Sequence, residues 1–406
     1  MAGSELARVR RVHEDRVLRV VREWGPLSRG DLELRTGLSR KTVSDITSSL
    51  LERRIIVSVP SPSTGERGRP PRLFALASGS GRFVGVDFGH QRVLVAAVSP
   101  SNEVIAQDSR RYADDAPWSR RVETALALID DLEREQRVDL DAVEGVGVGV
   151  SGPVGASAIA RSSSWAGAAT RHAVELVNSA FSERFAAPVV IDNNDRYAAL
   201  AEVVWGSARD VDHLLYVRSS HGVGGGLVID GRPVTGSHGM AGEIGHITVP
   251  GARARCWCGK HGCLETVISS GALIDAARRH DPSISTIGDI AERAAEPEVA
   301  VIVTRAAHVL AAALATITVV MDPRQVVVAG SIADLGEPFF HALTDEFEQL
   351  LMPARDILPI PRPSALGDEA GALGAIADAV RRTPLPVTRP TAVDLPKSTT
   401  SSKASR

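Results

Sequence analysis

The segment GEIGHITVPGARARCWCGKHGCLE, residues 242–265, contains all three cysteines of the 406-residue chain, and its first histidine precedes them in the order H-x9-C-x-C-x4-C. Thiolates and imidazole are ligands that zinc prefers, and four protein ligands close a tetrahedral shell with no position left for a catalytic water. Gly259 and Gly262 permit the tight turns of a metal knuckle, so we favour a structural zinc ion over three buried free thiols. The expected ligands are His246, Cys256, Cys258 and Cys263.

The sequence around this segment alternates between strand-like and helix-like stretches from Arg82 onward. Apolar strand patterns occur at 82–89, 93–100, 103–112, 143–153, 188–194, 213–220, 226–234 and 325–331. Helical patterns are expected up to Leu132, near 172–186, several times between 265 and 320, and at 369–382. Two α/β halves, each opening with antiparallel strands that lead into parallel ones, predict a two-lobed actin-like ATPase fold.

The first 80 residues have a different pattern. Residues 9–24 place valines at helical spacing and end at Gly25-Pro26, and a second helix, capped by Ser28, is expected to run to Gly37. A third helix follows, with Ser39 as its cap. Two short β-type segments around the loop at 61–71 complete the pattern of a winged helix-turn-helix.

Charge separates this N-terminal region from the rest of the chain. Residues 1–82 contain 16 Arg and Lys against 9 Asp and Glu, or +7, which leaves 30 against 40, or −10, for the remainder. A basic head on an acidic body favours contact of the head with a polyanion, although an Arg-rich solvated surface is the alternative. The residues expected to contact DNA are Ser39, Arg40, Lys41, Thr42 and Ser44 of the third helix and Arg67 and Arg69 of the loop.

Composition indicates an ordinary soluble globular protein, with 44% hydrophobic and 23% charged residues. The apolar run at 308–321 is shorter than a membrane span requires, and no secretory signal is expected, so we predict a cytoplasmic protein, associated with the nucleoid when bound to DNA. The predicted domains are the winged helix-turn-helix at 1–80, a first lobe at 81–195, a second lobe with the zinc knuckle at 196–382, and a disordered tail at 383–406.

Three motifs in order give the chain a recognisable resemblance. HGVGGGLVIDG at 221–231, GEIGH at 242–246 and CWCGKHGCLE at 256–265 closely resemble the ROK family of repressors, open reading frames and kinases. The resemblance extends over nearly the whole chain. It implies that an N-terminal winged helix marks the family's repressors, because its sugar kinases lack that domain.

The resemblance also implies a sugar site. In the family's kinases, sugar hydroxyls are held by side chains that correspond here to Asn193, Glu243, His246 and Glu265. The alternative is that Glu243 caps a turn and Glu265 starts a helix. The catalytic aspartate of the family aligns with Asn194, which we keep as a ligand-binding position, and an amide cannot take a proton from an attacking hydroxyl.

Both phosphate loops depart from the kinase pattern as well. The first loop, D-x-G-G-T in the family, reads DFGHQ at 87–91. A phosphate-binding loop needs a small residue so that its backbone can approach the phosphate, and the imidazole of His90 occupies that space. The second loop keeps its glycines at 222–226 but has His221 in place of the hydroxyl residue. We therefore expect no catalytic residues and no kinase activity.

The sequence thus predicts a sugar-responsive transcriptional regulator, a repressor, that binds a double-stranded DNA operator and a sugar or sugar-phosphate effector. One winged helix covers only a half-site, so we expect a homodimer or homotetramer, and no membrane contact. Two alternatives stay open: a ROK sugar kinase with residual ATP-dependent activity that also binds DNA, and a ligand-independent DNA-binding protein with a vestigial sugar site.

Overall fold

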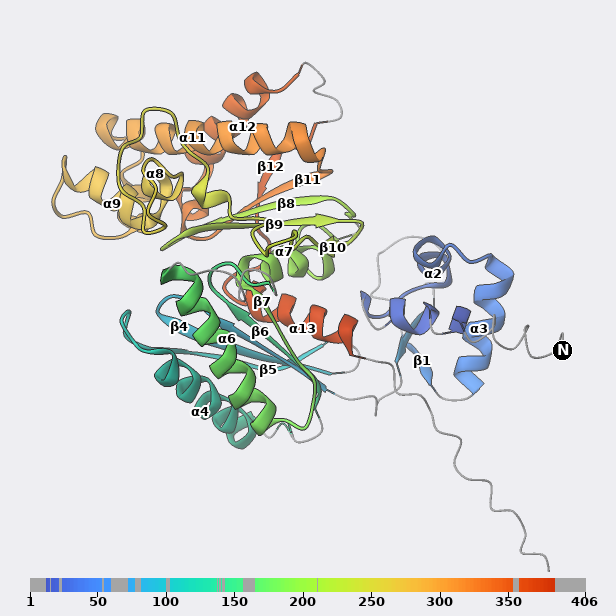
Figure 1. The fold of residues 1–406 in the computed structure, drawn as a ribbon. Helices are drawn as coiled ribbons and strands as arrows, with labels where there is room; N and C mark the ends of the chain where they lie inside the picture. Colours follow the sequence, from blue (N-terminus) through green and yellow to red (C-terminus); the bar gives the residue numbers. More distant parts are fainter. Residues whose placement is uncertain are drawn as a thin grey trace, which may run out of the picture.

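The computed structural model divides the chain into a small N-terminal head and a larger two-sheet body (Figure 1). It describes residues 12–14, 16–21, 24–52, 55–59, 72–76, 82–99, 103–136, 138, 140, 143–155, 165–209, 211–352 and 358–383. The tail beyond 383 and the loop positions Arg67 and Arg69 lie outside the described residues, so those predictions stay untested.

The head is a winged helix-turn-helix. Residues 12–14 and 16–21 are helical, and α2 (Arg29–Thr36) and α3 (Arg40–Glu52) follow, joined through Gly37 in the left-handed conformation. The Ser28 side chain caps α2 in a reciprocal capping box with Asp31, as its sequence predicts. Strands β1 (Ile56–Val59) and β2 (Leu73–Leu76) pair antiparallel, and Leu27 bridges to Phe74, which closes the head's small sheet over its apolar core.

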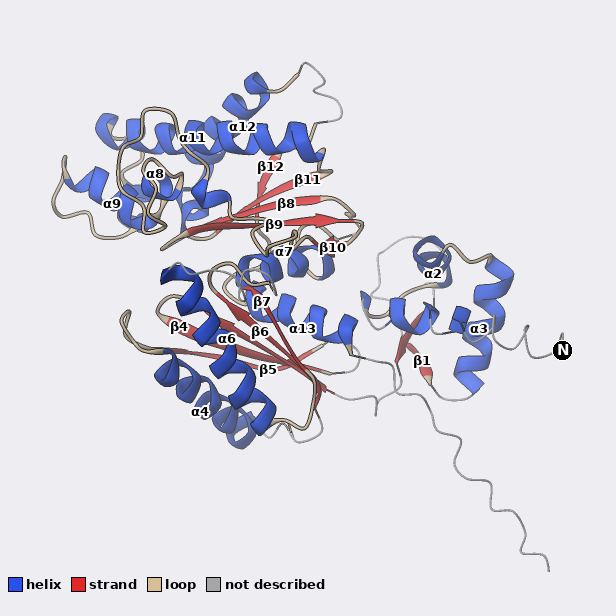
Figure 2. Cartoon of the chain, viewed as in Figure 1, coloured by secondary structure: helices blue, strands red, loops and turns tan. Residues whose placement is uncertain are grey.

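The first lobe is built on a five-stranded sheet in the order β5-β4-β3-β6-β7. Strands β3 (Arg82–Phe88), β4 (Arg92–Val98) and β5 (Val104–Arg111) form an antiparallel meander, and β6 (Val143–Val150) and β7 (Val189–Asn193) add to β3 in parallel. Helices α4 (Trp118–Gln136) and α6 (Trp165–Arg184) cover its outer face (Figure 2).

The second lobe repeats this plan with the strand order β10-β9-β8-β11-β12. Strands β8 (Leu214–Ser219), β9 (Val223–Ile229) and β10 (Arg232–Pro233) are antiparallel, whereas β11 (Gln325–Ala329) and β12 (Pro361–Pro363) run parallel to β8. The outer face carries the remaining helices: η1 (Ile244–His246), α8 (Glu265–Ile268), α9 (Ser270–Arg278), α10 (Ile287–Glu292), α11 (Pro297–Met321), η2 (Ser331–Leu335) and α12 (Gly336–Leu350).

Two helices fill the layer between the sheets. Helices α7 (Asn194–Val204) and α13 (Ala370–Arg382) pack against each other, α13 lies on the first sheet, and α7 lies on the second (Figure 1). Backbones approach closely here: a Cβ on Gly147 of β6 would lie 2.0 Å from the Ala375 carbonyl oxygen. The C-terminal helix therefore returns to the first lobe, a contact that the predicted boundaries at 81–195 and 196–382 do not convey.

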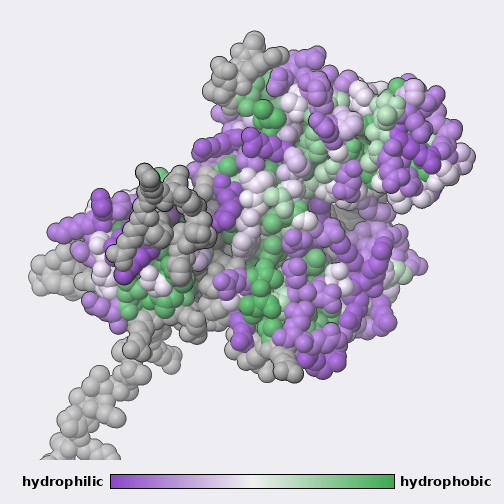
Figure 3. Space-filling view, turned by 180° about the vertical axis from the view of Figure 1, so that it is seen from behind, coloured by the Kyte–Doolittle hydropathy of each residue, from purple (hydrophilic) through white to green (hydrophobic). Residues whose placement is uncertain are grey.

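Helix α11 has the length and hydropathy to cross a membrane, but one face is committed to the second lobe. Val303, Leu310 and Leu314 are buried in the core of that lobe, and 44% of its most apolar window is buried. Seen from behind, the outer faces of both lobes are mostly hydrophilic, with apolar residues exposed in a band across the middle of the body (Figure 3).

Candidate functional site

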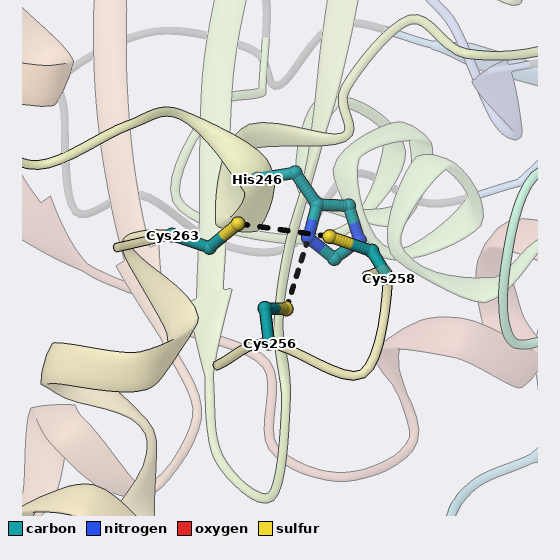
Figure 4. Close-up of side chains that lie close together, drawn as sticks. All are labelled: His246, Cys256, Cys258 and Cys263. Carbon is teal, nitrogen blue, oxygen red and sulfur yellow. Dashed lines mark hydrogen bonds between the residues drawn. The ribbon is translucent and has the colours of Figure 1, made fainter. Parts of the chain in front are cut away.

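Four potential metal ligands converge beside the second sheet. The Cys258 and Cys263 Sγ atoms lie 3.7 Å apart, His246 Nδ1 lies 3.7 Å from Cys256 Sγ, and all four ligand atoms lie within 4.8 Å of one another (Figure 4). A tetrahedral ion with zinc–sulfur bonds of about 2.3 Å has ligand–ligand edges of about 3.6 to 3.8 Å. The donor set and its spacing therefore fit a metal ion of this kind.

The backbone of residues 246–263, which we call the knuckle, is held by its own hydrogen bonds. Cys256 N–H donates to the Lys260 carbonyl at 2.8 Å, and Lys260 Nζ donates to the His246 carbonyl at 2.9 Å. Gly262 has a φ of +72°, and a Cβ there would lie 2.4 Å from the Ala252 oxygen, so only glycine fits this turn. Burial raises the pKa of the Cys256 thiol to about 12, so its thiolate needs a cation nearby.

The knuckle brings the predicted sugar-binding carboxylates to the boundary between the two lobes, which we call the cleft. Glu243 precedes η1, and its Oε2 lies 3.9 Å from His246 Nε2, the ring nitrogen that faces away from the thiols. Glu265 begins α8, and its Oε2 accepts the Val223 N–H at 3.1 Å. Burial, then the charges of Asp195 and Glu265, raise the pKa of Glu243 to about 7, which indicates that three carboxylates share this space. We call this group, Glu243, His246 and Glu265, the sugar side.

The two asparagines differ in what holds them. The Asn193 side chain caps α7 by accepting from the Asp195 and Arg196 N–H groups, and its amide nitrogen donates to the Gly152 carbonyl at 2.9 Å. Asn194 is buried and hydrogen-bonds Asp87. Asn193 therefore caps α7, and Asn194 lies beside Asp87, the first residue of the first phosphate loop.

Two histidines and a partly buried ion pair lie at the same boundary between the lobes. His90 follows β3 of the first lobe and His221 precedes β9 of the second, and their rings stack with centroids 3.4 Å apart and planes inclined by 15°. His90 Nε2 also lies 2.9 Å from Asp114 Oδ1. Burial, then the neighbouring His221, lower the pKa of His90, which favours a neutral ring. Both phosphate loops therefore place a histidine ring at this position: His90 from the first loop and His221 from the second.

Sequence reasoning missed a charge pair on this phosphate side, which we define as His90, His221, Asp87, Asp195 and Arg218. Arg218 Nε of β8 lies 2.6 Å from Asp195 Oδ1, and its Nη1 lies 4.0 Å from Asp87 Oδ2. Asp195 follows Asn194 on the chain but does not join it in its contact with Asp87. It faces the second lobe instead, because the first turn of α7 directs it toward β8 and β9.

Arg196 was also missed, although an Asp and an Arg four residues apart can pair on a helix start. Its side chain is fully buried, pairs with Asp192, and donates to the carbonyls of Val154 at 2.7 Å, Gly239 at 3.1 Å and Ala241 at 3.2 Å. Since Val154 belongs to the first lobe and 239–241 lead to Glu243 in the second, Arg196 ties the lobes together behind the sugar side.

The head presents the predicted DNA-contacting turn to solvent. Ser39, Arg40 and Lys41 are exposed, Thr42 and Ser44 are half-buried, and Val43 and Ile46 are buried in the head core. Ser39 accepts the Thr42 N–H at 3.2 Å and so caps α3. The amphipathic division of α3 matches a helix that packs by one face and offers the other.

Fold and site together define an actin-like ATPase body with a Cys/His cluster that could hold a metal ion and with a winged helix at its N-terminus. The chain belongs to the ROK family, whose sequence profile matches residues 83–381. The N-acetylglucosamine repressor of Escherichia coli O157:H7 is 27% identical over 394 residues, which cover 91% of this chain and 92% of that protein.

Two solved structures resemble this chain over different lengths. The crystal structure of a ROK family transcriptional regulator, a homologue of the Escherichia coli MLC protein, is 23% identical and covers 92% of this chain and 97% of its own, with a TM-score of 0.70. A ROK hexokinase from Thermus thermophilus is 26% identical and covers 73% of this chain and 98% of its own, with a TM-score of 0.61. The regulator structure thus matches a larger share of this chain than the hexokinase structure does.

Proposed function

We propose that this chain is a sugar-responsive, DNA-binding transcriptional repressor of the cytoplasm, whose body binds a sugar or sugar phosphate without phosphorylating it. The observation that carries the proposal is the division of the cleft. The sugar side keeps its carboxylates and histidine together, the phosphate side is closed by two stacked histidines, and a winged helix precedes both in the same chain.

The sugar side suits a polyhydroxyl ligand. Carboxylates such as Glu243 and Glu265 each accept two hydrogen bonds from neighbouring hydroxyls, which gives specificity for a ring with a fixed hydroxyl pattern. A metal on His246 Nδ1 leaves Nε2 directed toward Glu243, so the imidazole can join the same hydroxyl network.

Zinc, in this proposal, is a structural part of the sugar side. The knuckle begins at His246, three residues after Glu243, and ends at Cys263, two residues before Glu265. A bound ion fixes both ends of this loop and therefore the spacing of the two carboxylates. When bound, the ion supplies no chemistry beyond this cross-link, because its four protein ligands leave no open position.

The phosphate side gives the physical reason for the absence of transfer. Asn194 offers an amide where a base is needed, and the next carboxylate along the chain, Asp195, has its charge balanced by Arg218. His90 and His221 occupy the two loops that would approach a nucleotide phosphate. We therefore propose that sugar binding, not turnover, is the output of this cleft.

The head supplies the DNA contact in this proposal. Arg40 and Lys41 are positioned to contact base edges or phosphates in the major groove, and no described residue forms an ion pair with either of them. Because one recognition helix reads one half-site, the repressor acts as a homodimer or homotetramer on a two-fold operator.

A thermal-shift screen tests the proposal. Zinc-loaded full-length protein is screened against monosaccharides, disaccharides and sugar phosphates, with and without Mg-ATP, while ADP is measured, and operator duplexes are selected from a random pool. We expect a stabilising sugar whose effect is indifferent to ATP, no ADP, and a sugar-dependent change in operator affinity. Glu243→Gln should abolish the shift, whereas Glu298→Gln, an exposed glutamate of α11, should not. ADP formation would establish a kinase instead, and the absence of any sugar effect would contradict sugar sensing.

A further inference from the structure

One aromatic side chain joins the head to the body. Among the described hydrophobic residues, Trp24 packs against both the apolar core of the head and the core cluster that lies between the two sheets. Its partner in the body is the turn at 230–231, between β9 and β10: a Cβ on Gly231 would lie 3.5 Å from Cζ2 and 3.8 Å from Cη2 of the indole. Figure 1 places the head next to β10.

On the head side, Trp24 is tied to the DNA-reading unit. The Arg35 guanidinium lies over the indole ring, 3.9 Å from its centroid, at a distance typical of a cation–π contact. Arg35 is in the last turn of α2, immediately before the turn at Gly37 that leads to α3. A shift of the indole therefore acts on the end of α2 and, through this short turn, on the recognition helix.

On the body side, the same turn is the far end of a strand that starts in the cleft. Strand β9 begins at Val223, whose N–H is held by Glu265, directly after His221 and Gly222. Six residue pairs join β9 to β8 along its length, and β10 pairs on its other edge. A strand paired on both edges moves as a rigid element, and seven residues span about 20 Å.

The turn itself is fixed to the second lobe. Gly231 N–H donates to the Asp212 carbonyl at 3.0 Å, and Asp230 Oδ1 lies 3.8 Å from His213 Nε2. Both Asp230 and Gly231 have positive φ, which gives the tight connection of a two-residue hairpin. The turn therefore follows any rotation of the second lobe without deforming.

We infer that the Trp24–Gly231 contact is the relay through which the state of the sugar cleft reaches the recognition helix. The sequence of contacts is Glu265 and His221 at the cleft, β9, the turn at 230–231, the indole of Trp24, Arg35, and α3. This inference rests on the proposed function, because it assigns the route by which a bound sugar changes operator affinity. A contact of one ring with one turn is small, so two arrangements of head and body can be close in free energy.

A pair of glycine variants tests the relay from the body side and leaves the head unchanged. Gly231→Asn places a side chain against the indole, and asparagine tolerates positive φ. Gly271→Asn is the matched control, because Gly271 is an exposed glycine of α9 in the same lobe, outside the knuckle, and nothing lies within 4 Å of its Cβ position. With the sugar and operator found in the screen, we expect Gly231→Asn to reduce the sugar's effect on operator affinity from the usual range of about 5- to 150-fold to below about twofold.

Two tryptophan variants test the same contact from the head side. Trp24→Ala should retain operator binding without sugar and sugar binding without DNA, but lose the coupling between them, and Trp24→Phe should restore part of it. If Trp24→Ala unfolds the head, the relay is tested by the two glycine variants alone, through the sugar's effect on operator affinity. Full coupling in Gly231→Asn, or equal loss in Gly271→Asn, would overturn the relay.

A fluorine measurement separates failure of the relay from failure of sugar sensing. In full-length protein labelled with 5-fluorotryptophan, the Trp24 resonance is assigned by its loss in Trp24→Phe. His221→Ala, which removes the cleft stack without any ligand, should shift that resonance, whereas Val320→Ala on the exposed face of α11 should not. An unmoved Trp24 resonance in His221→Ala would overturn the relay even if a sugar binds, and a shifted one would support it even if no sugar is found.

Discussion

The two sides of the cleft differ in what their side chains are free to do. On the sugar side, the knuckle brings Glu243 and His246 together, and Glu243 Oε2 lies 3.9 Å from His246 Nε2. On the phosphate side, His90 stacks on His221 and Asp195 pairs with Arg218, so polar groups are satisfied within the protein. The sugar side therefore presents carboxylates and an imidazole that can bind a ligand, whereas the polar groups of the phosphate side are used in contacts between the lobes.

Loss of the metal should produce the largest effect, because it removes the frame of the sugar side. Cys258→Ser leaves three ligands for an ion whose binding contributes on the order of 10 kcal/mol in small zinc domains. We expect loss of stoichiometric zinc, a markedly lower Tm and no sugar-induced stabilisation, measured by metal analysis and thermal unfolding. His261→Ala, at an exposed histidine of the same loop that is outside the ligand set, is the control and should retain zinc.

Arg196 holds the two sides in register, so its removal should have the next largest effect. Arg196→Met leaves Asp192 buried without its partner and three carbonyls without a donor, at an expected cost of about 3–5 kcal/mol in the free energy of unfolding. Chemical denaturation measures the loss. Arg120→Met breaks an exposed pair with Glu123 and should cost less than about 1 kcal/mol; equal costs would refute the bridging role of Arg196.

Restoring a carboxylate at the base position should not restore a kinase. Asn194→Asp removes the amide that bonds Asp87 and sets two carboxylates together in a buried place, so stability should fall by about 1–3 kcal/mol. With the histidine stack in place, no ADP should form in the presence of sugar and Mg-ATP. Turnover in this variant would show that the phosphate side still admits nucleotide.

The smallest expected effect is a pH dependence from the histidine stack. His90 faces Asp114, His221 and Arg121, and its folded-state pKa lies below the unfolded value of about 6.5. The unfolded chain therefore takes up the proton first, so this contribution to stability is present above that pH and is lost as the pH falls through the folded-state pKa. His90→Gln should flatten the dependence of the unfolding free energy between about pH 5 and 7, with little change at pH 8.

Much of the fold was accessible from the sequence because it rests on local patterns. The helix-turn-helix follows from apolar spacing and from capping by Ser28 and Ser39, and the structure confirms both α2 and α3. The alternation of strands from Arg82 onward likewise predicted the two sheets. The return of α13 to the first lobe was not predictable, because it depends on glycines such as Gly147 that look ordinary in a strand until a helix lies on them.

The candidate site was accessible only in part. The metal ligands were predicted from spacing alone, because His246 and the cysteines lie within 18 residues of one another. The Arg218–Asp195 pair and the His90–His221 stack join residues of different lobes, and no sequence spacing reports such a contact. The ligand contact of Asn193 stays a prediction from its motif, and the structure adds that the same side chain caps α7.

Whether the body binds a sugar without phosphorylating it is tested by calorimetric titration. The zinc-loaded protein is titrated with the stabilising sugar, with and without Mg-ATP, and the mixture is then analysed for ADP and sugar phosphate. We expect the same sugar affinity in both titrations and no ADP, because sugar binding at Glu243, His246 and Glu265 does not depend on a nucleotide at the phosphate side. ATP-dependent affinity together with stoichiometric ADP and a phosphorylated sugar would contradict it.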